Sequence, residues 1–353
     1  MTDLVLSPVV AFASTLIGHH DVVAFLGNEL KRSSHAYLFV GPTGTGKATL
    51  AREFARVLLC PDNGEHEVPC SSCRRIGTGN HPDLIVVEPE GRTSLGADTA
   101  RWVVGQAVLT PVESERRVFL VEEAGLMTDQ AANALLKTLE EPSAPVVFLL
   151  VAESEEDFPS TVASRCRIVR MGRVPENDLT LALIDRGIEE KKAQVLALVS
   201  SGRPGLALQL AGQPEIAELR QTWLSVPNRL SARPGDAITL AEELLARIEP
   251  LATQVAASQP TADQRDRAKR RAGQSLLAGG LEILASFYLD SASLQLGGPI
   301  RNTDVPLPDL TRASPARAVA ASHQVLDAIV DLAGNLRPVP VLAALFSSLA
   351  ADS

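Results

Sequence analysis

The sequence predicts an α/β protein that begins with a layered parallel sheet and ends in helical domains. Over about residues 12–171, short apolar runs alternate with helical patterns, and such alternation is typical of a parallel sheet. The apolar runs are nearly continuous, as expected of strands that are covered on both faces. Beyond about residue 174 only helical periodicity remains, so we expect the second half to be all-α.

The first part is expected to hold five strands with helices between them. The strands are AYLFV (36–40), LIVV (84–87), RVFLV (117–121), VVFLLV (146–151) and RIVRM (167–171). The helices are predicted at 47–59, 97–109, 128–140 and 159–164. Pro61 and Pro142 follow two of these helices closely, and a proline at that place stops a helix.

The remaining sequence predicts two helical domains. Short helical segments follow one another at first, and Gly187, Gly202 and Gly212 lie between them as C-terminal caps do. Longer amphipathic stretches come next, with one loop, LGGPIRNTDVPLPDLTRASPA, among them. The expected domains are an α/β domain over 1–172, a small helical lid over 173–212 and a larger helical domain over 213–353.

Net charge limits the direct nucleic-acid contacts of the chain. Its 353 residues carry a formal net charge of −9, so no overall basic field attracts it to DNA. A DNA role would need a local patch or a partner chain. The run RDRAKRRAG (265–273) offers such a patch, although a solvated helix face is its more ordinary interpretation.

The sequence also favours a cytoplasmic location. The N-terminal stretch contains Asp3 and has no Lys or Arg before Lys31, which is unlike the positive start of a secretory signal. The run LLAGGLEILASFYL is interrupted by Glu282 and is too short to span a membrane. Four cysteines in a chain of this length do not make a disulfide scaffold. We therefore expect a cytoplasmic protein without membrane contact.

Residues 41–51 read GPTGTGKATLA, which has the spacing of a P-loop, G-x-x-x-x-G-K-[ST]. The loop follows a strand and opens a helix, so its N–H groups and the helix N-terminus can surround phosphate oxygens. Ala48 stands where the pattern has the Ser or Thr that holds Mg²⁺, and Thr49 lies about 100° further round the helix. The nucleotide-binding residues predicted here are Gly41, Gly44, Thr45, Gly46, Lys47, Ala48 and Thr49.

Glu122 and Glu123 follow the predicted strand RVFLV and complete the predicted nucleotide site. A metal-holding carboxylate followed by a water-activating one would have this pattern. The first position is usually Asp, and an octahedral Mg²⁺ site tolerates the longer Glu poorly. We expect phosphate binding to be possible and Mg²⁺ placement to be impaired. The alternative is two solvated acids at a strand end.

Several stretches resemble the clamp-loader branch of the AAA+ ATPases. They are LIGHHDVV (16–23), HAYLFVGPTGTGK (35–47), NALLKTLEEP (133–142) and FPSTVASRC (158–166). The resemblance covers about the first 210 residues, and NLRPVPVLAALF (335–346) is similar to the last helix of the family's collar domain. It implies an AAA+ P-loop sheet and a lid, followed by an all-α collar that joins subunits.

Four departures distinguish the chain from the motor subunits of this branch, gamma and tau. Motors have Ser or Thr after the P-loop lysine, Asp at the first acidic position, a polar residue ending the sensor strand and a phosphate-touching arginine in the lid. The residues at these places are Ala48, Glu122, Ala152 (with Glu153 beside it) and Gly205 (with Arg203 nearby). In this the chain is similar to the delta-prime type, an AAA+ fold that no longer hydrolyses ATP. The resemblance implies that any bound ATP is held without turnover.

The SRC motif retains one catalytic feature. Arg165 follows a short helix, and in this family that arginine points into the nucleotide site of the neighbouring subunit. A guanidinium is always charged and can contact two oxygens, which suits the charge that develops on a transferred phosphoryl group. The resemblance therefore implies an arginine finger in trans. The alternative is a structural arginine paired with an acid.

Three cysteines resemble the small zinc module that clamp-loader subunits carry after the P-loop helix: Cys60, Cys70 and Cys73. The family pattern has a fourth cysteine where Ile76 stands, and a structural Zn²⁺ site takes four ligands. Either His66 or His81 could supply the missing ligand, or the site could be eroded. Cys166 belongs to the SRC motif and is not expected to be a ligand.

The resemblance implies a delta-prime stator in a five-membered clamp loader. Its partners would be gamma/tau and delta subunits, with the sliding clamp and primed DNA engaged through the complex. One alternative is an active gamma/tau-type ATPase that tolerates the four departures. Another is an interaction scaffold in which Arg165 has no catalytic role. Hydrolysis of ATP by the isolated chain would favour the active ATPase.

Overall fold

The computed structural model describes most of the chain beyond residue 15. The described residues are 16–66, 68–89, 94–142, 145–213, 215–259, 261–333 and 336–351. They form two compact units, of which the first holds Met1–Leu179 with Arg203–Gly205 and the second Thr180–Gly202 with Leu206–Ser353. The expectation about a secretory signal depends mainly on residues 1–15, which lie outside the described residues.

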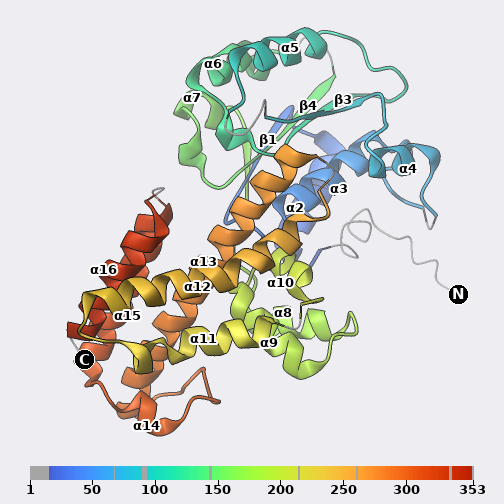
Figure 1. Ribbon diagram of the computed structural model, residues 1–353. Helices are drawn as coiled ribbons and strands as arrows, with labels where there is room; N and C mark the ends of the chain where they lie inside the picture. The colour runs from blue at the N-terminus through green and yellow to red at the C-terminus, as the bar shows by residue number, and fades with distance from the viewer. Residues whose placement is uncertain are drawn as a thin grey trace, which may run out of the picture. The chain divides into compact units, whose positions relative to one another are not determined.

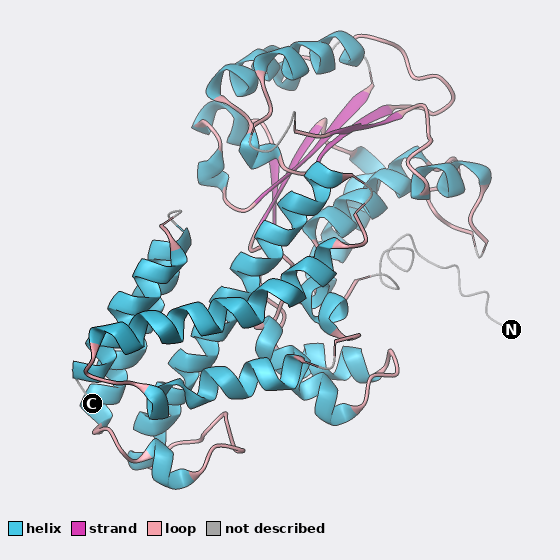
Figure 2. Ribbon diagram, viewed as in Figure 1, coloured by secondary structure: helices cyan, strands magenta, loops and turns pink. Residues whose placement is uncertain are grey.

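A five-stranded parallel sheet forms the centre of the first unit (Figures 1 and 2). The strand order is β2-β3-β4-β1-β5, and every neighbouring pair is parallel. β1 lies between β4 and β5, so that Tyr37 pairs with both Leu149 and Arg167. The strands are β1 (Ala36–Val40), β2 (Leu84–Val87), β3 (Arg117–Val121), β4 (Val146–Ala152) and β5 (Arg167–Arg170). The predicted parallel α/β sheet is confirmed.

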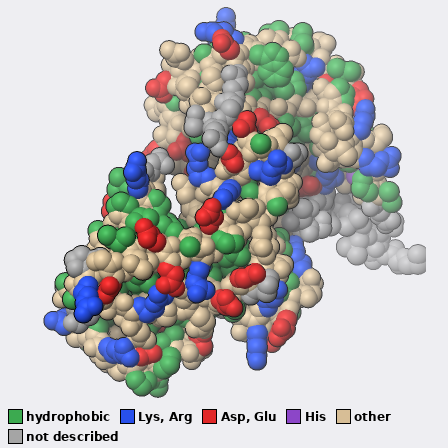
Figure 3. Space-filling view, in the orientation of Figure 1, with side chains coloured by type: hydrophobic (Ala, Val, Ile, Leu, Met, Phe, Trp, Pro, Cys, Tyr) green, Lys and Arg blue, Asp and Glu red, His purple; other side chains and the backbone are tan. Residues whose placement is uncertain are grey.

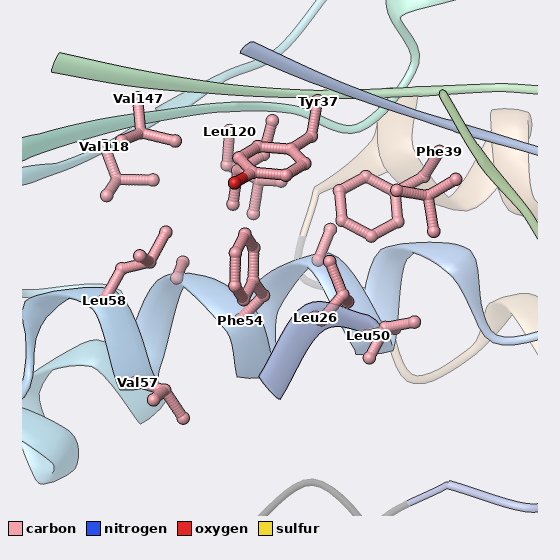
Figure 4. Packing of buried hydrophobic residues seen from close by; sticks show 14 of the residues in the cluster. Leu26, Tyr37, Phe39, Leu50, Phe54, Val57, Leu58, Val118, Leu120 and Val147 are labelled. Atoms are coloured by element: carbon pink, nitrogen blue, oxygen red, sulfur yellow. The ribbon is translucent and has the colours of Figure 1, made fainter. Parts of the chain in front are cut away.

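Alternate residues of the strands pack into two separate hydrophobic layers, which is why the strand sequences are continuously apolar. On one face, Phe54 packs edge-on against Tyr37 of β1 with ring centroids 5.0 Å apart (Figure 4). On the other face, Phe119 and Phe148 stack at the same centroid separation. The sheet is therefore fixed from both sides, and its carboxyl edge is a rigid base for the loops that follow the strands.

The predicted helices of this unit are present, with ends that differ by at most two residues. They are α3 (Lys47–Leu59), α5 (Ala97–Ala107), α6 (Asp129–Glu140) and α7 (Ser160–Ala163). Helix α6 begins one residue later than predicted because Thr128 is its N-cap, with a hydroxyl that accepts from the Ala131 N–H at 3.2 Å. Two further helices were not predicted, α2 (His20–Glu29) and α4 (Ser71–Gly77).

The second unit is helical throughout its described part. Its helices are α9 (Glu190–Ser200), α11 (Ile216–Arg229), α12 (Pro234–Ala256), α13 (Ala262–Gln295), α14 (Leu307–Leu310), α15 (Pro315–Ala333) and α16 (Pro338–Ala351). Two helices, α8 (Glu176–Ile184) and α10 (Pro204–Leu210), have residues in both units. The 34 residues of α13 make it about 50 Å long. The finer division into a lid and a collar stays a prediction.

A partly buried polar network holds the loop between α13 and α14. The Arg220 guanidinium pairs with Asp304 and donates to the Asn302 side chain at 2.8 Å. Asp290 accepts from the backbone N–H groups of Arg301 and Asn302 at 2.8 and 2.7 Å. The Arg220 hydrogen bond holds the pKa of Asp304 below its usual value. The long loop seen in the sequence is thus fixed by specific contacts.

Two cations of the basic run on α13 are not free at the surface. Arg267 is buried, and Lys269 pairs with Glu249 of α12 at 3.0 Å. Figure 3 shows Lys and Arg side chains interspersed with Asp and Glu on the visible face of the helical unit. The solvated-face interpretation of residues 265–273 stays a prediction. None of the described helices combines the length and hydropathy needed to span a bilayer.

We expect Gly280→Ala to destabilise the protein. A Cβ at Gly280 would lie 2.0 Å from the Trp223 ring, and Trp223 is fully buried, so the helices α11 and α13 would have to separate. Overpacking of this kind costs about 1–3 kcal/mol of unfolding free energy, measurable by chemical denaturation.

Gly273→Ala is the matched control for that substitution. Gly273 lies in the same helix, and its added Cβ would meet only the Ala252 Cβ at 3.9 Å, an ordinary contact. Ala is a better helix former than Gly by about 1 kcal/mol, so this variant should be as stable as the natural chain or more so. Equal effects of the two substitutions would contradict the close Trp223 packing.

Candidate functional site

The loop between β1 and α3 has the backbone of a phosphate-binding loop. Gly41, Gly44 and Gly46 have φ values of 145°, 86° and 100°, a region that favours glycine. A Cβ at Gly41 would lie 2.0 Å from the Met171 carbonyl oxygen, so only glycine fits there. Helix α3 begins at Lys47, and its N-terminal N–H groups lie at the carboxyl end of β1. Phosphate-binding loops use this combination of glycines and helix N-terminus.

The charged and polar side chains of this loop contact its own carbonyl groups. Lys47 is 7% exposed, and its ammonium donates to the Pro42 carbonyl at 2.8 Å and to that of Gly41. The Thr45 hydroxyl donates to the Pro42 carbonyl at 2.9 Å. Ala48 is half-buried and Thr49 is exposed. A phosphate would therefore compete with the loop's own oxygens for the Lys47 ammonium.

The first acid predicted to hold a metal ion is paired with an arginine. Glu122 follows β3 and forms an ion pair with Arg52 of α3. Arg52 lies four residues after Ala48, on the helix face that carries the Ser or Thr hydroxyl in the complete P-loop pattern. A guanidinium thus balances the carboxylate that was predicted to hold Mg²⁺. Glu123, the second predicted acid, is half-buried beside it.

A second carboxylate contacts the loop from β4. That strand ends at Ala152, and the carboxylate of the next residue, Glu153, accepts a hydrogen bond from the Thr43 hydroxyl. The Glu153 carbonyl also accepts from the Gly41 N–H at 3.1 Å. A motor subunit is expected to have a neutral polar group at the position of Ala152, which is buried here and offers none. A negative charge on the neighbouring Glu153 would repel a phosphate.

Residues 203–205 belong to the first unit and lie against the same loop. The Gly205 N–H donates to the Gly44 carbonyl at 2.9 Å, and a Cβ on Gly205 would be 3.1 Å from that oxygen. Arg203 is 4% exposed. The backbone therefore contacts the loop at the position where a motor subunit is expected to have a phosphate-touching arginine.

Arg165 lies at the surface, after α7, and is held by two groups. Its Nε donates to the Glu140 carboxylate of α6 at 2.7 Å, and its Nη1 donates to the Thr161 carbonyl at 2.6 Å. The Arg165 side chain is 32% exposed. Both sequence-based interpretations are compatible with this arrangement, since the guanidinium is paired with an acid and is also reachable from outside.

Four side chains converge at the far end of α3 in an arrangement suited to a metal ion. The ligand atoms of Cys60, His66, Cys70 and Cys73 all lie within 4.8 Å of one another. The His66 Nε2 is 3.3 Å from the sulfur atoms of both Cys60 and Cys73, and the Cys60 and Cys70 sulfurs are 3.9 Å apart. Tetrahedral Zn²⁺ requires about 3.6 Å between nitrogen and sulfur and about 3.8 Å between sulfurs. The four residues therefore fit Zn²⁺.

The other histidine and cysteine considered from the sequence lie outside this group. The His81 ring is buried, with Nε2 at 2.9 Å from the Ser72 hydroxyl and 3.0 Å from the Glu113 carboxylate. Burial lowers the pKa of His81. Burial also raises the pKa of Cys166, to about 12, which keeps that thiol protonated at neutral pH. Of the two histidines that the sequence left open, the structure brings His66 to the cysteines.

Comparison with known proteins identifies the family of the sheet domain. Residues 18–175 match the protein family described as DNA polymerase III, delta subunit. The chain is 33% identical to DNA polymerase III subunit delta' of Bacillus subtilis over 218 residues, which cover 61% of this chain and 65% of that protein. It is 37% identical to subunit delta' of Pseudomonas aeruginosa over 186 residues, or 51% of this chain and 56% of that protein.

Residues 18–175 belong to the delta' family of DNA polymerase III subunits.

The delta' relatives share this chain's sequence over only part of their length. The chain spans between about half and two thirds of the two relatives above. A motor subunit is also similar: DNA polymerase III subunit tau/gamma of Haemophilus influenzae is 35% identical over 170 residues, which cover 47% of this chain and 24% of that protein. A DNA polymerase III gamma subunit-related protein from Thermotoga maritima overlays with a TM-score of 0.46 at 18% identity, covering 94% and 99% of the two chains, which adds nothing to the assignment.

The sequence alone did not reveal the partners of the charged residues at these sites. Arg52 and Glu140 were not singled out, although both have a detectable signal. Arg52 lies one helical turn after Ala48 and therefore on the same face, and Glu140 lies in the NALLKTLEEP stretch. Both contacts join residues far apart in the chain, so the fold was needed to show which acid each arginine meets.

We expect the full chain to bind one Zn²⁺ ion with an affinity that depends on His66. His66→Ala removes one of four ligands, and its cost should exceed the roughly 10–100-fold loss that follows removal of an outer partner of a ligand. Competition with a chromophoric zinc chelator measures the affinity. His81→Ala is the control and should retain zinc, because its ring contacts Ser72 and Glu113. Dependence on His81 and not on His66 would contradict the observed cluster.

Proposed function

We propose that this chain is the delta'-type subunit of a DNA polymerase III clamp loader and that it acts as a stator. In this proposal gamma/tau subunits bind and hydrolyse ATP, a delta subunit completes the five-membered complex, and the sliding clamp is loaded on primed DNA. The chain itself turns over little or no ATP. It supplies Arg165 to the nucleotide site of an adjacent motor, and its helical domain joins the collar of the complex.

One observation carries this proposal: the charged groups of the chain's own P-loop site are already matched within the protein. Lys47 contacts loop carbonyls, Glu122 pairs with Arg52, and Glu153 accepts from Thr43. The Ser or Thr hydroxyl that would hold Mg²⁺ is absent at Ala48. Catalysis of phosphoryl transfer depends on positioned cations and on free metal ligands, so this arrangement disfavours turnover. Any phosphate held by the loop would be retained rather than transferred.

Arg165 is available for the stator role. Its guanidinium is 32% exposed and contacts two acceptors, Glu140 and Thr161, so a neighbouring chain could reach it. A scaffold with a structural Arg165 would have the same contacts, and the reconstitution test below separates the two. The active motor is a second candidate because a tau/gamma subunit is 35% identical to part of this chain.

The four-residue metal site is assigned a structural role in the same proposal. All four positions around a Zn²⁺ ion would be taken by Cys60, His66, Cys70 and Cys73, which leaves no open position for water or substrate. Bound Zn²⁺ would supply folding energy and link the end of α3 to α4. The ion would not take part in the reaction at the motor site.

We expect Arg165→Ala to lower the ATPase rate of a clamp loader reconstituted with this chain. Loss of an arginine finger costs about 10³–10⁵-fold at the site that it completes, so the contribution of that motor site should disappear. Steady-state phosphate release in the presence of clamp and primed DNA measures the effect. Arg170→Ala is the matched control, because Arg170 follows closely in the chain, is exposed and pairs with Glu155.

Lys47→Ala in this chain distinguishes the stator from the active motor. A stator complex should keep its ATPase rate, whereas a motor would lose the share of its own site. The isolated chain should show no ATP turnover above a blank. Robust turnover that Lys47→Ala abolishes would establish the motor instead. A complex whose rate ignores both Arg165→Ala and Lys47→Ala would contain this chain as a scaffold.

A further inference from the structure

Arg56 lies between the end of the P-loop helix and the metal cluster. It is on the last turns of α3, and its Nη1 lies 3.6 Å from the Cys73 sulfur, within hydrogen-bonding distance of that atom. Its Nε donates to the Glu53 carboxylate at 2.8 Å. The Arg56 and Glu53 side chains are 18% and 22% exposed, so both contacts are largely shielded from water.

The helix ends place the cluster beside this guanidinium. Cys60 is the C-cap of α3, and Cys70 is the N-cap of α4, where its sulfur accepts from the Cys73 N–H at 3.5 Å. Cys73 is 3% exposed. A metal-bound thiolate buried to this degree requires hydrogen-bond donors to offset its lost hydration. Arg56 brings a charged donor to the sulfur from another helix.

The net negative charge of the zinc site gives the Arg56 N–H donor a role. Three thiolates and one neutral imidazole leave a net charge of −1 around Zn²⁺, and an N–H group directed at sulfur draws electron density away from it. Arg74 and Arg75 also lie beside the cluster in sequence. Arg74 donates to the Pro69 carbonyl, and Arg75 pairs with Glu113. Their recorded contacts are therefore directed at groups other than the cluster sulfurs.

We propose that Arg56 is a positioning residue of the zinc site: its guanidinium hydrogen-bonds the Cys73 thiolate and holds it toward the ion, while Glu53 fixes the guanidinium. The proposal rests on the zinc site and is independent of the stator function. It gives the sulfur of the buried Cys73 a fixed orientation from α3, in a site where His66 takes the place of a fourth cysteine.

Zinc and cobalt binding to the full chain test this role. Arg56→Gln should lower Zn²⁺ affinity by about 10–100-fold in competition with a chromophoric chelator, and Arg56→Lys should recover part of the loss. With Co²⁺ as a spectroscopic probe, loss of the N–H···S contact should shift the sulfur-to-cobalt charge-transfer band. Glu53→Gln keeps the donor and should have a smaller effect. Arg101→Gln is the matched control, since Arg101 is an exposed helix arginine paired with Asp98.

Thermal unfolding separates positioning from simple packing. Arg56→Gln should lower the melting temperature of the zinc-loaded chain and leave that of the metal-free chain nearly unchanged. Equal losses in both forms, or unchanged zinc affinity in both Arg56 variants, would overturn the proposal. If Arg56→Gln does not fold, Arg56→Lys takes its place. A shifted sulfur-to-cobalt charge-transfer band in Arg56→Lys would support the proposal, and a band identical to that of the natural chain would overturn it. A natural chain that binds no Zn²⁺ would also overturn it, while leaving the reconstitution test of Arg165 valid.

Discussion

The backbone contact between Gly41 and the end of β5 is the constraint on which the site depends. β1 lies between β4 and β5, and the turn after β1 passes so close to the Met171 carbonyl that a Cβ would be 2.0 Å from it. This approach fixes where the loop leaves the sheet and therefore where α3 begins. Because α3 then packs Phe54 against Tyr37, the loop, the helix and the metal cluster at the helix end share one rigid support. The fold thus positions both candidate sites.

The backbone shape of a phosphate-binding loop and the side chains around it have separate constraints in this unit. The glycine φ angles and the helix N-terminus are those of a phosphate-binding loop, because they are required by packing against Met171 and Gly205. The side chains have different constraints. Arg52 pairs with Glu122 at the edge of the sheet and leaves the strand packing intact. The shape of the loop therefore depends on packing, independently of what the loop binds.

Local patterns predicted the sheet well because its strands are buried on both faces. The strands at 36–40 and 117–121 and the helix at 47–59 agree with the structure at both ends, since apolar runs and flanking breakers define them. Helix 97–109 ends at Ala107, two residues early, and α2 and α4 lacked a strong enough pattern. The choice between His66 and His81 depended on the path of a loop, and the pairing of Arg52 with Glu122 joins residues 70 positions apart. Such contacts follow from tertiary structure and have no local signature.

The ion pair between Glu140 and Arg165 affects how strongly Arg165 could bind a phosphate of a neighbouring chain. Transfer of the guanidinium to a phosphate would exchange one anion for another, so only the difference between the two attractions would be gained. A triphosphate concentrates more negative charge than a single carboxylate, whereas the products of hydrolysis offer less at the same point. Such a competition would let the two chains engage and separate in step with the charge on the nucleotide, with the internal carboxylate as the return position of the arginine.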